Sequence, residues 1–596
     1  MRQLKDDILK LLKIFNKKEK RKITILFIMM LMAAFFETIG IGLIIPFVGI
    51  VTSPEIIQKQ TVLSYLYELF NFHSNTSFII FLVVVLLSVF LLKNSFILFF
   101  QYLQYRVVLN QQVKLSSKLL REYLIKPYTF HLQRNTADLL RNVNAEVPKV
   151  FQGIVISLFQ LITEILVTIC ILALLLITSP IATLTASLLL GGSVLLFLKF
   201  FRKKISYLGK EQQKVGGLMI KWVNQGLGAS KEVKVSGKEN FFIKSYSELS
   251  GINAKHNMFI KMLDQAPRLF IETLLVSVVL VTMIILIFQK ENTSQLISTM
   301  ALFAMAAFRL MPSINRIIGF IAMIRFSQPA LSVIYEDLFT NNEQLTNNIQ
   351  QSDLNSINTS LSKKYFKDEI KLQEVSFKYP NQKDYSVNNI SLTIPIGKSV
   401  AFIGESGAGK TTIVDIILGL FQPDQGRVSV DGRDLSNIKS LWQKRIGYIP
   451  QSIYLTDDTI RCNVAFAIDV DEIDDAAVWK ALEQAQLKDF VKSLPKQLDS
   501  EVGEQGIRLS GGQRQRIGIA RALYHNPEIL FMDEATSALD NNTEKEIMKA
   551  IDSLKGHKTL IIIAHRLSTI EKCDIVFKMN KGSLVEIDNK LVKSVM

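Results

Sequence analysis

The chain has 596 residues, which is too long for one hydrophobic core and predicts two or more domains. Hydrophobic residues make up 49% of it, and long uncharged runs before about residue 330 exclude a wholly soluble protein. The formal charge of +16 does not indicate nucleic-acid binding, because much of the basic excess flanks apolar runs, in NKKEKRK (16–22) and FRKK (201–204). Cys170, Cys462 and Cys573 lie far apart and predict neither a disulfide framework nor a zinc site.

Six runs are long enough to span a bilayer, because a core of about 30 Å requires about 20 apolar residues in a helix. These runs are 23–51, 78–105, 151–179, 181–200, 269–289 and 294–314. An even number of spans with basic connectors on one side places both termini and the connectors in the cytoplasm. No cleavable signal peptide is expected, because roughly 22 mostly polar residues precede a first run that is too long for a signal sequence.

The long connectors 106–150 and 201–268 are predicted to be helical, with apolar residues at helical spacing and few glycines. They are interrupted at 126–135 and 224–235. Each interruption predicts a turn and a short transverse helix, and the alternative is an ordinary cytoplasmic loop.

Residues 53–70, between the first two runs, carry Leu63, Leu66, Tyr67 and Phe70 at helical spacing. This pattern predicts an amphipathic helix on the outer membrane surface or, equally well, a connector packed on the protein.

The composition changes after the last run. Asn, Gln and Ser dominate 340–364, and from Ile370 short β-rich segments alternate with helical ones. We therefore predict a multidomain membrane protein. It comprises a six-helix, all-α transmembrane domain of residues 1–330, a linker of 331–368 and an α/β domain of 369–596.

The segment SVAFIGESGAGKTTIVDIIL (399–418) has the strand, glycine-rich loop and helix of a P-loop. Backbone N–H groups of such a loop surround phosphates, Lys410 would reach the β and γ oxygens, and the Thr411 hydroxyl could ligate magnesium. The predicted nucleotide contacts of this loop are Gly404, Glu405, Ser406, Gly407, Ala408, Gly409, Lys410, Thr411 and Thr412.

The segment ILFMDEAT (529–536) predicts an apolar strand that ends in two acids. Asp533 could hold the magnesium shell, and Glu534 could polarise the water that attacks the γ-phosphate.

The segment LSGGQRQRIGIARAL (509–523) resembles the signature sequence of ATP-binding cassette (ABC) proteins. The other motifs of that family follow in order: Tyr379 in VSFKYP, Gln451 in YIPQ, Asp540 in SALD and His565 in IIAHR. Several short motifs in this order identify the chain as a member of the ABC family.

The resemblance implies a role for each motif residue. Tyr379 would stack on adenine, Gln451 would sense magnesium and water, and His565 would contact the γ-phosphate. Ser510, Gly511 and Gly512 would cap the γ-phosphate of ATP bound to a facing subunit. The resemblance also assigns Gln513 and Asp540 to the nucleotide site.

The chain carries one set of motifs and six spans, which is half of a complete transporter of this family. The resemblance therefore implies a homodimer with two composite ATP sites, and a heterodimer with another chain stays open. Residues 501–512, EVGEQGIRLSGG, and the long connectors resemble those of exporters rather than importers. The chain has no N-terminal peptidase domain, which weakens the case for a cargo-cleaving peptide exporter without excluding peptides.

Charged residues interrupt the apolar runs. Counted from the predicted outer ends at about 1.5 Å per residue, Glu37 and Lys93 share a depth of roughly 21 to 23 Å. We predict that they form an ion pair that pins the first span to the second, since each neutralises the other. The alternative pairs Lys93 with Glu164.

Arg309 and Arg316 share a helix face that could line a cavity and receive an anionic head group. Arg268 could join them, unless Glu272, one turn on, neutralises it. The alternative is a purely structural pairing between helices.

Three short segments resemble ABC flippases of the lipid-linked oligosaccharide type: 37–47 (ETIGIGLIIPF), 93–94 (KN) and 307–316 (AFRLMPSINR). The resemblance implies that ATP and Mg²⁺ drive a polyprenyl-pyrophosphate glycan from the inner to the outer leaflet of a bacterial cytoplasmic membrane. The helix predicted at 53–70 would meet the lipid tail. The alternatives are export of a peptide or an amphipathic drug, and a regulatory or channel-like ABC protein, although an intact catalytic set argues against the last.

Overall fold

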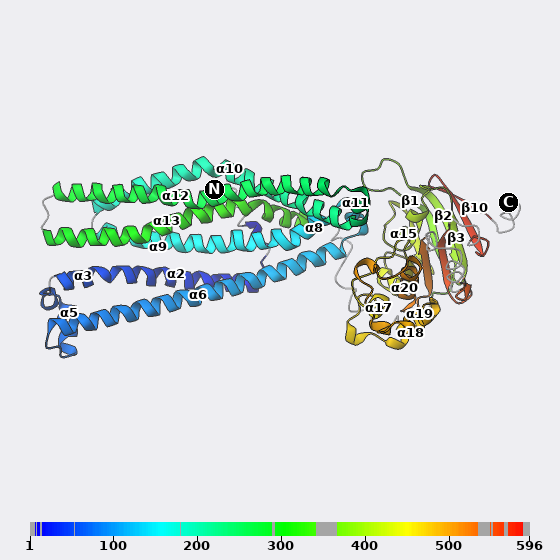
Figure 1. Cartoon of the computed structure of the whole chain (residues 1–596), viewed down its shortest axis with the longest axis horizontal. Helices are drawn as coiled ribbons and strands as arrows, with labels where there is room; N and C mark the ends of the chain where they lie inside the picture. The colour runs from blue at the N-terminus through cyan, green and yellow to red at the C-terminus, as the bar shows by residue number, and fades with distance from the viewer. Residues whose placement is uncertain are drawn as a thin grey trace. The chain divides into compact units, whose positions relative to one another are not determined.

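The computed structural model describes residues 15–52, 54–178, 180–288, 293–340, 366–533, 552–564 and 570–587, and the single residues 6, 9, 10, 11, 13 and 549. The chain forms two compact units (Figure 1). The helical unit comprises Met1–Lys126 and Arg134–Gln350, and the α/β unit comprises Pro127–Gln133 and Gln351–Met596.

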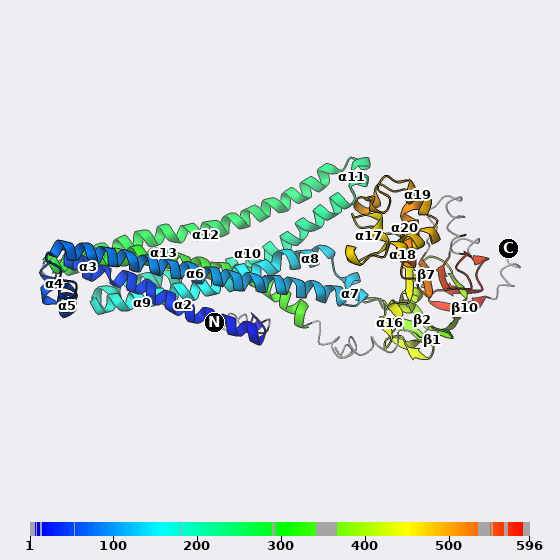
Figure 2. The same cartoon turned by 90° about the horizontal axis from the view of Figure 1, so that it is seen from below.

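Long helices build the helical unit (Figures 1 and 2). They are α2 (Lys17–Gly42), α3 (Ile44–Thr52), α6 (Asn75–Ile125), α9 (Ser157–Thr178), α10 (Pro180–Gly228), α12 (Glu239–Phe288) and α13 (Thr293–Tyr335). Shorter elements are α8 (Thr136–Arg141) and the π-helical turns η1 (Asn142–Glu146), η2 (Lys149–Ile156) and η3 (Glu336–Thr340).

The described residues of every predicted span lie in helical segments, and the first span is divided at Leu43, between α2 and α3. Within the described residues, four segments are long and apolar enough to cross a membrane. They are Lys17–Gly40, Asn75–Ile125, Thr136–Ile177 and Leu310–Phe339.

Helix α13 is the central element of the helical unit, because it packs against α9, α10 and α12, while α2 packs against α6 and α9. Ile171 of α9, Ile271 of α12 and Ile318 of α13 are buried in one hydrophobic cluster. The crossing of α10 and α13 is tight, since a Cβ atom on Gly209 would lie 2.4 Å from the Phe326 carbonyl oxygen. Glycine is therefore required there.

Both predicted interruptions of the long connectors are confirmed. Helix α6 ends at Ile125 and is followed by the short helix α7 (Tyr128–Gln133). Helix α10 ends at Gly228 and is followed by α11 (Ser230–Ser236). Helix α7 belongs to the α/β unit, where the Tyr128 ring lies 5.8 Å from the Phe421 ring.

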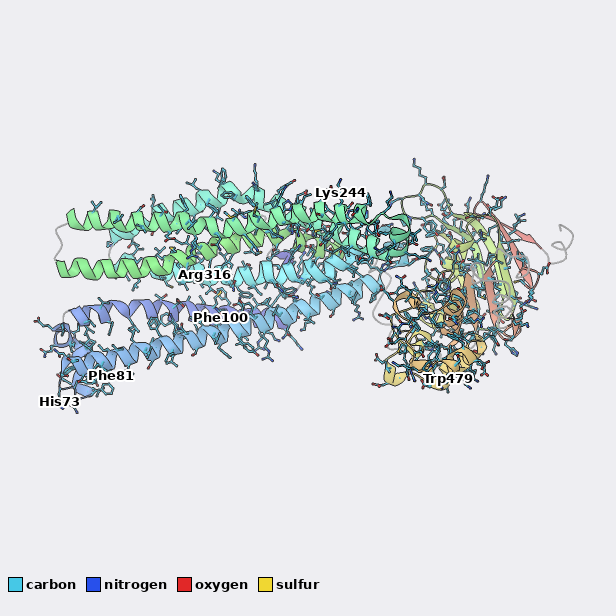
Figure 3. The ribbon with its side chains drawn as sticks, viewed as in Figure 1. His73, Phe81, Phe100, Lys244, Arg316 and Trp479 are labelled. Atoms are coloured by element: carbon cyan, nitrogen blue, oxygen red, sulfur yellow. The ribbon has the colours of Figure 1, made fainter. Side chains whose placement is uncertain are left out.

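Residues 54–70 form two short helices, α4 (Ile56–Lys59) and α5 (Thr61–Leu69). Leu63, Leu66 and Tyr67 pack against the buried Ile57 and Phe78, so these three face the protein. Phe70, the fourth residue of the predicted face, is 53% exposed. The packed-connector interpretation therefore fits three of the four side chains. Phe81 and His73 mark this end of α6 in Figure 3.

The α/β unit contains two sheets. A six-stranded sheet has the order β10 (Ser583–Ile587), β9 (Ile575–Asn580), β3 (Ser399–Ile403), β8 (Thr559–Ile563), β7 (Ile529–Asp533) and β6 (Ile446–Ile449). A four-stranded sheet has the order β2 (Val387–Pro395), β1 (Glu369–Phe377), β4 (Gln425–Val430) and β5 (Arg433–Asp434). The larger sheet is parallel except for β10.

Helices and turns accompany these sheets (Figure 2). They are α15 (Lys410–Ile417), α16 (Lys439–Gln443), α17 (Ile460–Val464), α18 (Asp475–Gln484), α19 (Lys488–Ser493), α20 (Gly511–Leu523) and the short turns η4 (Val470–Glu472), η5 (Gln497–Asp499) and η6 (Glu504–Gly506). Every residue of β7 and β8 is buried, as expected for central parallel strands. The carboxyl ends of β3, β7 and β6 share one edge, which places the P-loop, Asp533 and Gln451 there.

Candidate nucleotide-binding site and charged residues of the helical unit

The P-loop joins β3 to α15 and depends on glycines at two tight positions. Gly404 has φ +146°, and a Cβ atom there would lie 2.3 Å from the Met579 carbonyl oxygen. Gly409 has φ +98°, and its Cβ atom would lie 2.6 Å from the Ser386 carbonyl oxygen. A side chain at either position would collide with a backbone carbonyl, so this loop conformation requires glycine. The loop backbone leads directly into the N-terminus of α15.

The Lys410 side chain lies within the P-loop. Its ammonium group donates to the carbonyl oxygens of Gly404 at 2.9 Å and of Glu405 at 3.0 Å, and the residue is 6% exposed. Glu405, Ser406, Gly407 and Thr411 are exposed, whereas Ala408 is buried. A buried cation surrounded by an exposed loop can attract phosphate oxygens.

Tyr379 lies beside the P-loop helix. Its hydroxyl is 3.0 Å from the Thr412 hydroxyl, and its ring makes edge contacts with the rings of Phe377 and Phe421 at 5.4 and 5.5 Å. Burial raises the pKa of Tyr379, although the Thr412 hydrogen bond acts in the opposite sense. The predicted adenine-binding residue is therefore held rigidly next to Thr412.

Two carboxylates lie at the carboxyl edge of the larger sheet. Asp533 ends β7 and is 9% exposed. Burial raises the pKa of Asp415, on α15, to about 7, and the negative charge of Asp533 adds to the shift. The negative charge of Asp533 at this edge favours a bound cation. Gln451 is exposed two residues after the end of the neighbouring strand β6.

The signature segment forms the N-terminus of α20. The Ser510 hydroxyl accepts from the Gln513 N–H at 3.3 Å, and the Gln513 side-chain oxygen accepts from the Ser510 N–H at 2.8 Å. This capping box fixes the first turn. Ser510 and Gly511 are exposed, and Gly512 is partly exposed, so the first turn of α20 is accessible to a ligand.

Three predicted site residues, Glu534, Asp540 and His565, lie outside the described residues. Glu534 directly follows the last residue of β7, and His565 comes two residues after β8. Their strands end at the same edge as the P-loop strand β3, because β3, β8 and β7 are parallel neighbours.

The structure brings Glu37 and Lys93 together. The Lys93 ammonium lies 3.7 Å from a Glu37 carboxylate oxygen, and the two side chains are 10% and 16% exposed, respectively. The same ammonium lies 4.7 Å from the centre of the Phe90 ring. Gly40 leaves room for it, since a Cβ atom there would lie 3.3 Å from Lys93 Cδ. Lys93 therefore occupies a site made by both α2 and α6.

Glu164 pairs with Arg316 rather than with Lys93. Arg316 Nε lies 2.8 Å from a Glu164 carboxylate oxygen and joins α13 to α9, and Figure 3 shows Arg316 partway along α13. Glu164 is 12% exposed and Arg316 is 42% exposed. The alternative Lys93–Glu164 arrangement is therefore wrong for this structure.

The other predicted head-group residues are not brought into this pair. Arg268 is exposed, and among the described residues neither it nor Glu272 forms an ion pair. Arg309 belongs to α13, but its side chain lies outside the described part of the chain.

Sequence reasoning missed one signal near the Glu164–Arg316 pair. Polar side chains on the same two helices carry buried atoms that make no hydrogen bond to any described residue. These atoms are Glu164 Oε2, Thr168 Oγ1, Ser313 Oγ and Asn315 Oδ1. Glu164 and Thr168 are one turn apart on α9, and Ser313 and Asn315 are close together on α13. This spacing of polar residues in apolar runs could have been recognised in the sequence.

A helical unit with long apolar helices, together with a P-loop and a capped signature helix on one chain, defines an exporter-type ABC half-transporter. Residues 387–537 match the family described as "ABC transporter", and residues 56–311 match the "ABC transporter transmembrane region". The chain belongs to the ABC transporter family, and its α/β unit contains that family's ATP-hydrolysing domain.

Two bacterial relatives match over most of their length. The ATP-dependent lipid A-core flippase of Saccharophagus degradans is 31% identical over 490 residues, covering 81% of this chain and 79% of the relative. The protein of the same name from Ralstonia nicotianae is 30% identical over 81% of this chain and 79% of the relative. A solved structure of a bacterial Atm1-family ABC exporter with ATP bound has the same fold, with a TM-score of 0.75, 21% identity, and coverage of 98% of this chain and 97% of that one.

Proposed function

We propose that the chain is one half of an ATP-driven flippase that moves a phosphorylated glycolipid from the inner to the outer leaflet of a bacterial cytoplasmic membrane. The substrate class that we favour is a polyprenyl-pyrophosphate-linked oligosaccharide. The names of the two flippase relatives support a lipid substrate, and the segments 37–47, 93–94 and 307–316 support the lipid-linked oligosaccharide.

The observation that carries this proposal is the polar region around Arg316 in an otherwise apolar set of helices. Arg316 bonds one oxygen of Glu164 through Nε and is 42% exposed, so the rest of its guanidinium can meet a ligand. The hydroxyls of Thr168 and Ser313 lack hydrogen bonds to any described residue. Buried polar groups of this kind favour a partner with many hydrogen-bonding groups, as a phosphorylated sugar has.

Turnover at the nucleotide site would use the residues assigned by the family motifs. Lys410 would exchange its two loop carbonyl bonds for β and γ oxygens, and the backbone N–H groups of the loop would bind the phosphates. Tyr379 would stack on the adenine, Glu534 would polarise the attacking water, and His565 would contact the γ-phosphate.

The residues fit a Mg²⁺ ion. Burial raises the pKa of Asp415 and the negative charge of Asp533 adds to the shift, and a bound divalent cation would neutralise the Asp533 charge. Thr411, Gln451 and Asp533 would hold the ion, which would stabilise negative charge on the phosphates.

We propose that two copies of the chain assemble head to tail. The exposed Ser510 and Gly511 at the N-terminus of α20 would then cap the γ-phosphate bound by Lys410 of the other copy. A sequence with one intact set of motifs gives two equivalent sites in such a dimer.

The test is ATPase activity of purified protein in nanodiscs, titrated with a polyprenyl-pyrophosphate glycan. We expect stimulation in the wild type and loss of stimulation by about tenfold in Arg316→Ala, with basal activity kept. Arg202→Ala is the matched control, because Arg202 is an exposed arginine on α10 outside this region. Equal stimulation of the wild type and Arg316→Ala would contradict the head-group role.

Lipid A with its core sugars is the second candidate, because two relatives have names that contain this substrate. It shares the phosphorylated sugar head group but has no polyprenyl tail. Stimulation by this lipid alone would identify it as the substrate, and stimulation by an amphipathic peptide alone would contradict the lipid proposal.

A further inference from the structure

A buried polar cluster surrounds Asp337 at the base of α13. The Tyr123 hydroxyl donates to Asp337 Oδ2 at 2.5 Å. The Asn142 amide donates to the same oxygen at 3.0 Å and to the Tyr123 oxygen at 3.1 Å. The Arg134 guanidinium lies 3.7 Å from Oδ1, so both carboxylate oxygens have partners.

Lys126 closes the cluster from the other side, because its ammonium donates to the Asp337 carbonyl oxygen at 3.2 Å. Tyr123, Lys126, Asn142 and Asp337 are all buried, at 3%, 7%, 3% and 2% exposed. A buried network in which each group has a partner permits few arrangements, and removing one member leaves the others unsatisfied. We call these five residues the Asp337 cluster.

The position of the cluster along the chain is informative. The chain leaves the helical unit after Lys126, returns at Arg134 and leaves again after Gln350. Lys126 and Arg134 are therefore the two residues that flank the segment assigned to the α/β unit. Asp337 lies in η3, the last described element before β1. Asp337 thus contacts both ends of the first excursion, because its carboxylate pairs with Arg134 and its backbone carbonyl accepts from Lys126, and it lies in the element that precedes the second excursion.

Neighbouring contacts hold this helix base against α6. The rings of Tyr335 and Phe339 lie 4.8 Å apart, and the Lys118 ammonium of α6 lies 5.8 Å from the centre of the Phe339 ring. The base of α13 therefore contacts α6 through the Lys118 ammonium over the Phe339 ring and through the Tyr123 hydrogen bond to Asp337.

We propose that Asp337 is a positioning residue that makes the base of α13 and the ends of the α7 segment move as one body. Through it, a change in the nucleotide state of the α/β unit would reach the helices. The proposal rests on ATP-driven transport as the activity, and it assigns the coupling to a residue that touches neither nucleotide nor lipid.

The experiment measures hydrogen exchange in α6 and α13 of the full-length protein in nanodiscs, with and without ADP and vanadate. We expect a nucleotide-dependent change in the wild type. In Asp337→Ala this change should fall about fivefold or more, while the Kd for ATP stays within about twofold. Tyr123→Phe should act in the same direction, because it removes a single hydroxyl from the cluster.

Glu248→Gln is the matched control, since Glu248 is an exposed carboxylate on α12 outside the cluster. It should keep the wild-type response. A wild-type response in both Asp337→Ala and Tyr123→Phe overturns the proposal, and so does a large loss of ATP affinity in Tyr123→Phe. If Asp337→Ala does not fold, Tyr123→Phe decides. The readout needs no lipid-linked glycan, so failure of the flippase proposal leaves it interpretable.

Discussion

The α/β unit and the helical unit place their functional groups in different ways. In the α/β unit, consecutive residues make the candidate site: Gly404 to Thr412 form one loop that would bind phosphates, and Ser510 and Gln513 cap one helix within a single turn. In the helical unit, residues far apart in sequence make each pair, as Glu164 and Arg316 do. Local sequence therefore specifies the first kind of site, and tertiary packing specifies the second.

The largest expected effect tests the local site. Glu534→Gln should reduce ATP hydrolysis by about a hundredfold or more while ATP binding persists, because the attacking water loses its base. Hydrolysis of [γ-³²P]ATP and equilibrium binding measure the two quantities. Full hydrolysis in this variant would refute the assignment of Glu534.

Mixed dimers test whether the site is completed by a second copy. Lys410→Ala and Gly512→Asp should each be inactive alone, the first for lack of a phosphate-binding cation and the second through repulsion of the γ-phosphate. Coexpressed with separate tags, they should form dimers with one intact composite site and recover about half of the wild-type activity per dimer. No recovery in purified mixed dimers would contradict the shared site.

The two charge pairs test the packing-dependent sites. Glu37→Gln leaves the 10% exposed Lys93 ammonium without its carboxylate partner, whereas Glu164→Gln leaves Arg316 42% exposed. Loss of one partner of a buried pair costs about 3–5 kcal/mol, so Glu37→Gln should lower the apparent melting temperature more. Equal decreases in melting temperature in the two variants would mean that burial does not determine how much each pair stabilises the protein. The double charge reversal Glu37→Lys with Lys93→Glu should recover part of the loss.

The α10–α13 crossing gives a smaller test with a control in the same helix. Gly209→Ala places a methyl group against the Phe326 carbonyl and should cost about 1–3 kcal/mol. Gly216→Ala meets no atom within 4 Å and should stabilise the helix by about 0.5–1 kcal/mol. Apparent melting temperatures in nanodiscs measure both. A harmless Gly209→Ala would contradict the tight crossing.

The smallest expected effect concerns a thiol of the α/β unit. Burial raises the pKa of Cys573 from 9.0 to about 11. The reactive thiolate is therefore about a hundredfold rarer than at an ordinary cysteine near neutral pH, and its fraction rises with pH toward that value. Alkylation by iodoacetamide, followed by mass spectrometry, should be much slower at Cys573 than at the half-buried Cys462. Equal rates would contradict the burial of Cys573.

Much of the fold could be predicted from the sequence, because it depends on patterns within short windows. The long apolar runs predict helices, and the interruptions at 126–135 and 224–235 predict the breaks before α7 and α11. The break at Leu43 and the π-helical turns η1 and η2 were not predicted, although Pro46 lies three residues after the break and Pro148 lies between the two turns. The domain limits 1–330, 331–368 and 369–596 stay predictions.

The candidate site residues also include some that short sequence windows predict and some that depend on tertiary packing. The P-loop contacts follow from motif spacing, and a shared depth suggested Glu37 with Lys93. Depth along an ideal helix could not identify the partner of Glu164, because Arg316 reaches it across α9 and α13 with a long side chain. The Asp337 cluster was also missed, since Tyr123 and Asp337 are 214 residues apart.

Translocation itself tests the central claim most directly. Proteoliposomes with a fluorescent polyprenyl-pyrophosphate glycan would report lipid that becomes accessible to a membrane-impermeant quencher on the leaflet opposite the ATP-binding units. We predict ATP-dependent translocation by the wild type and none above the protein-free rate by Glu534→Gln. Equal translocation with and without ATP hydrolysis, or none for any phosphorylated glycolipid, would contradict an ATP-driven flippase.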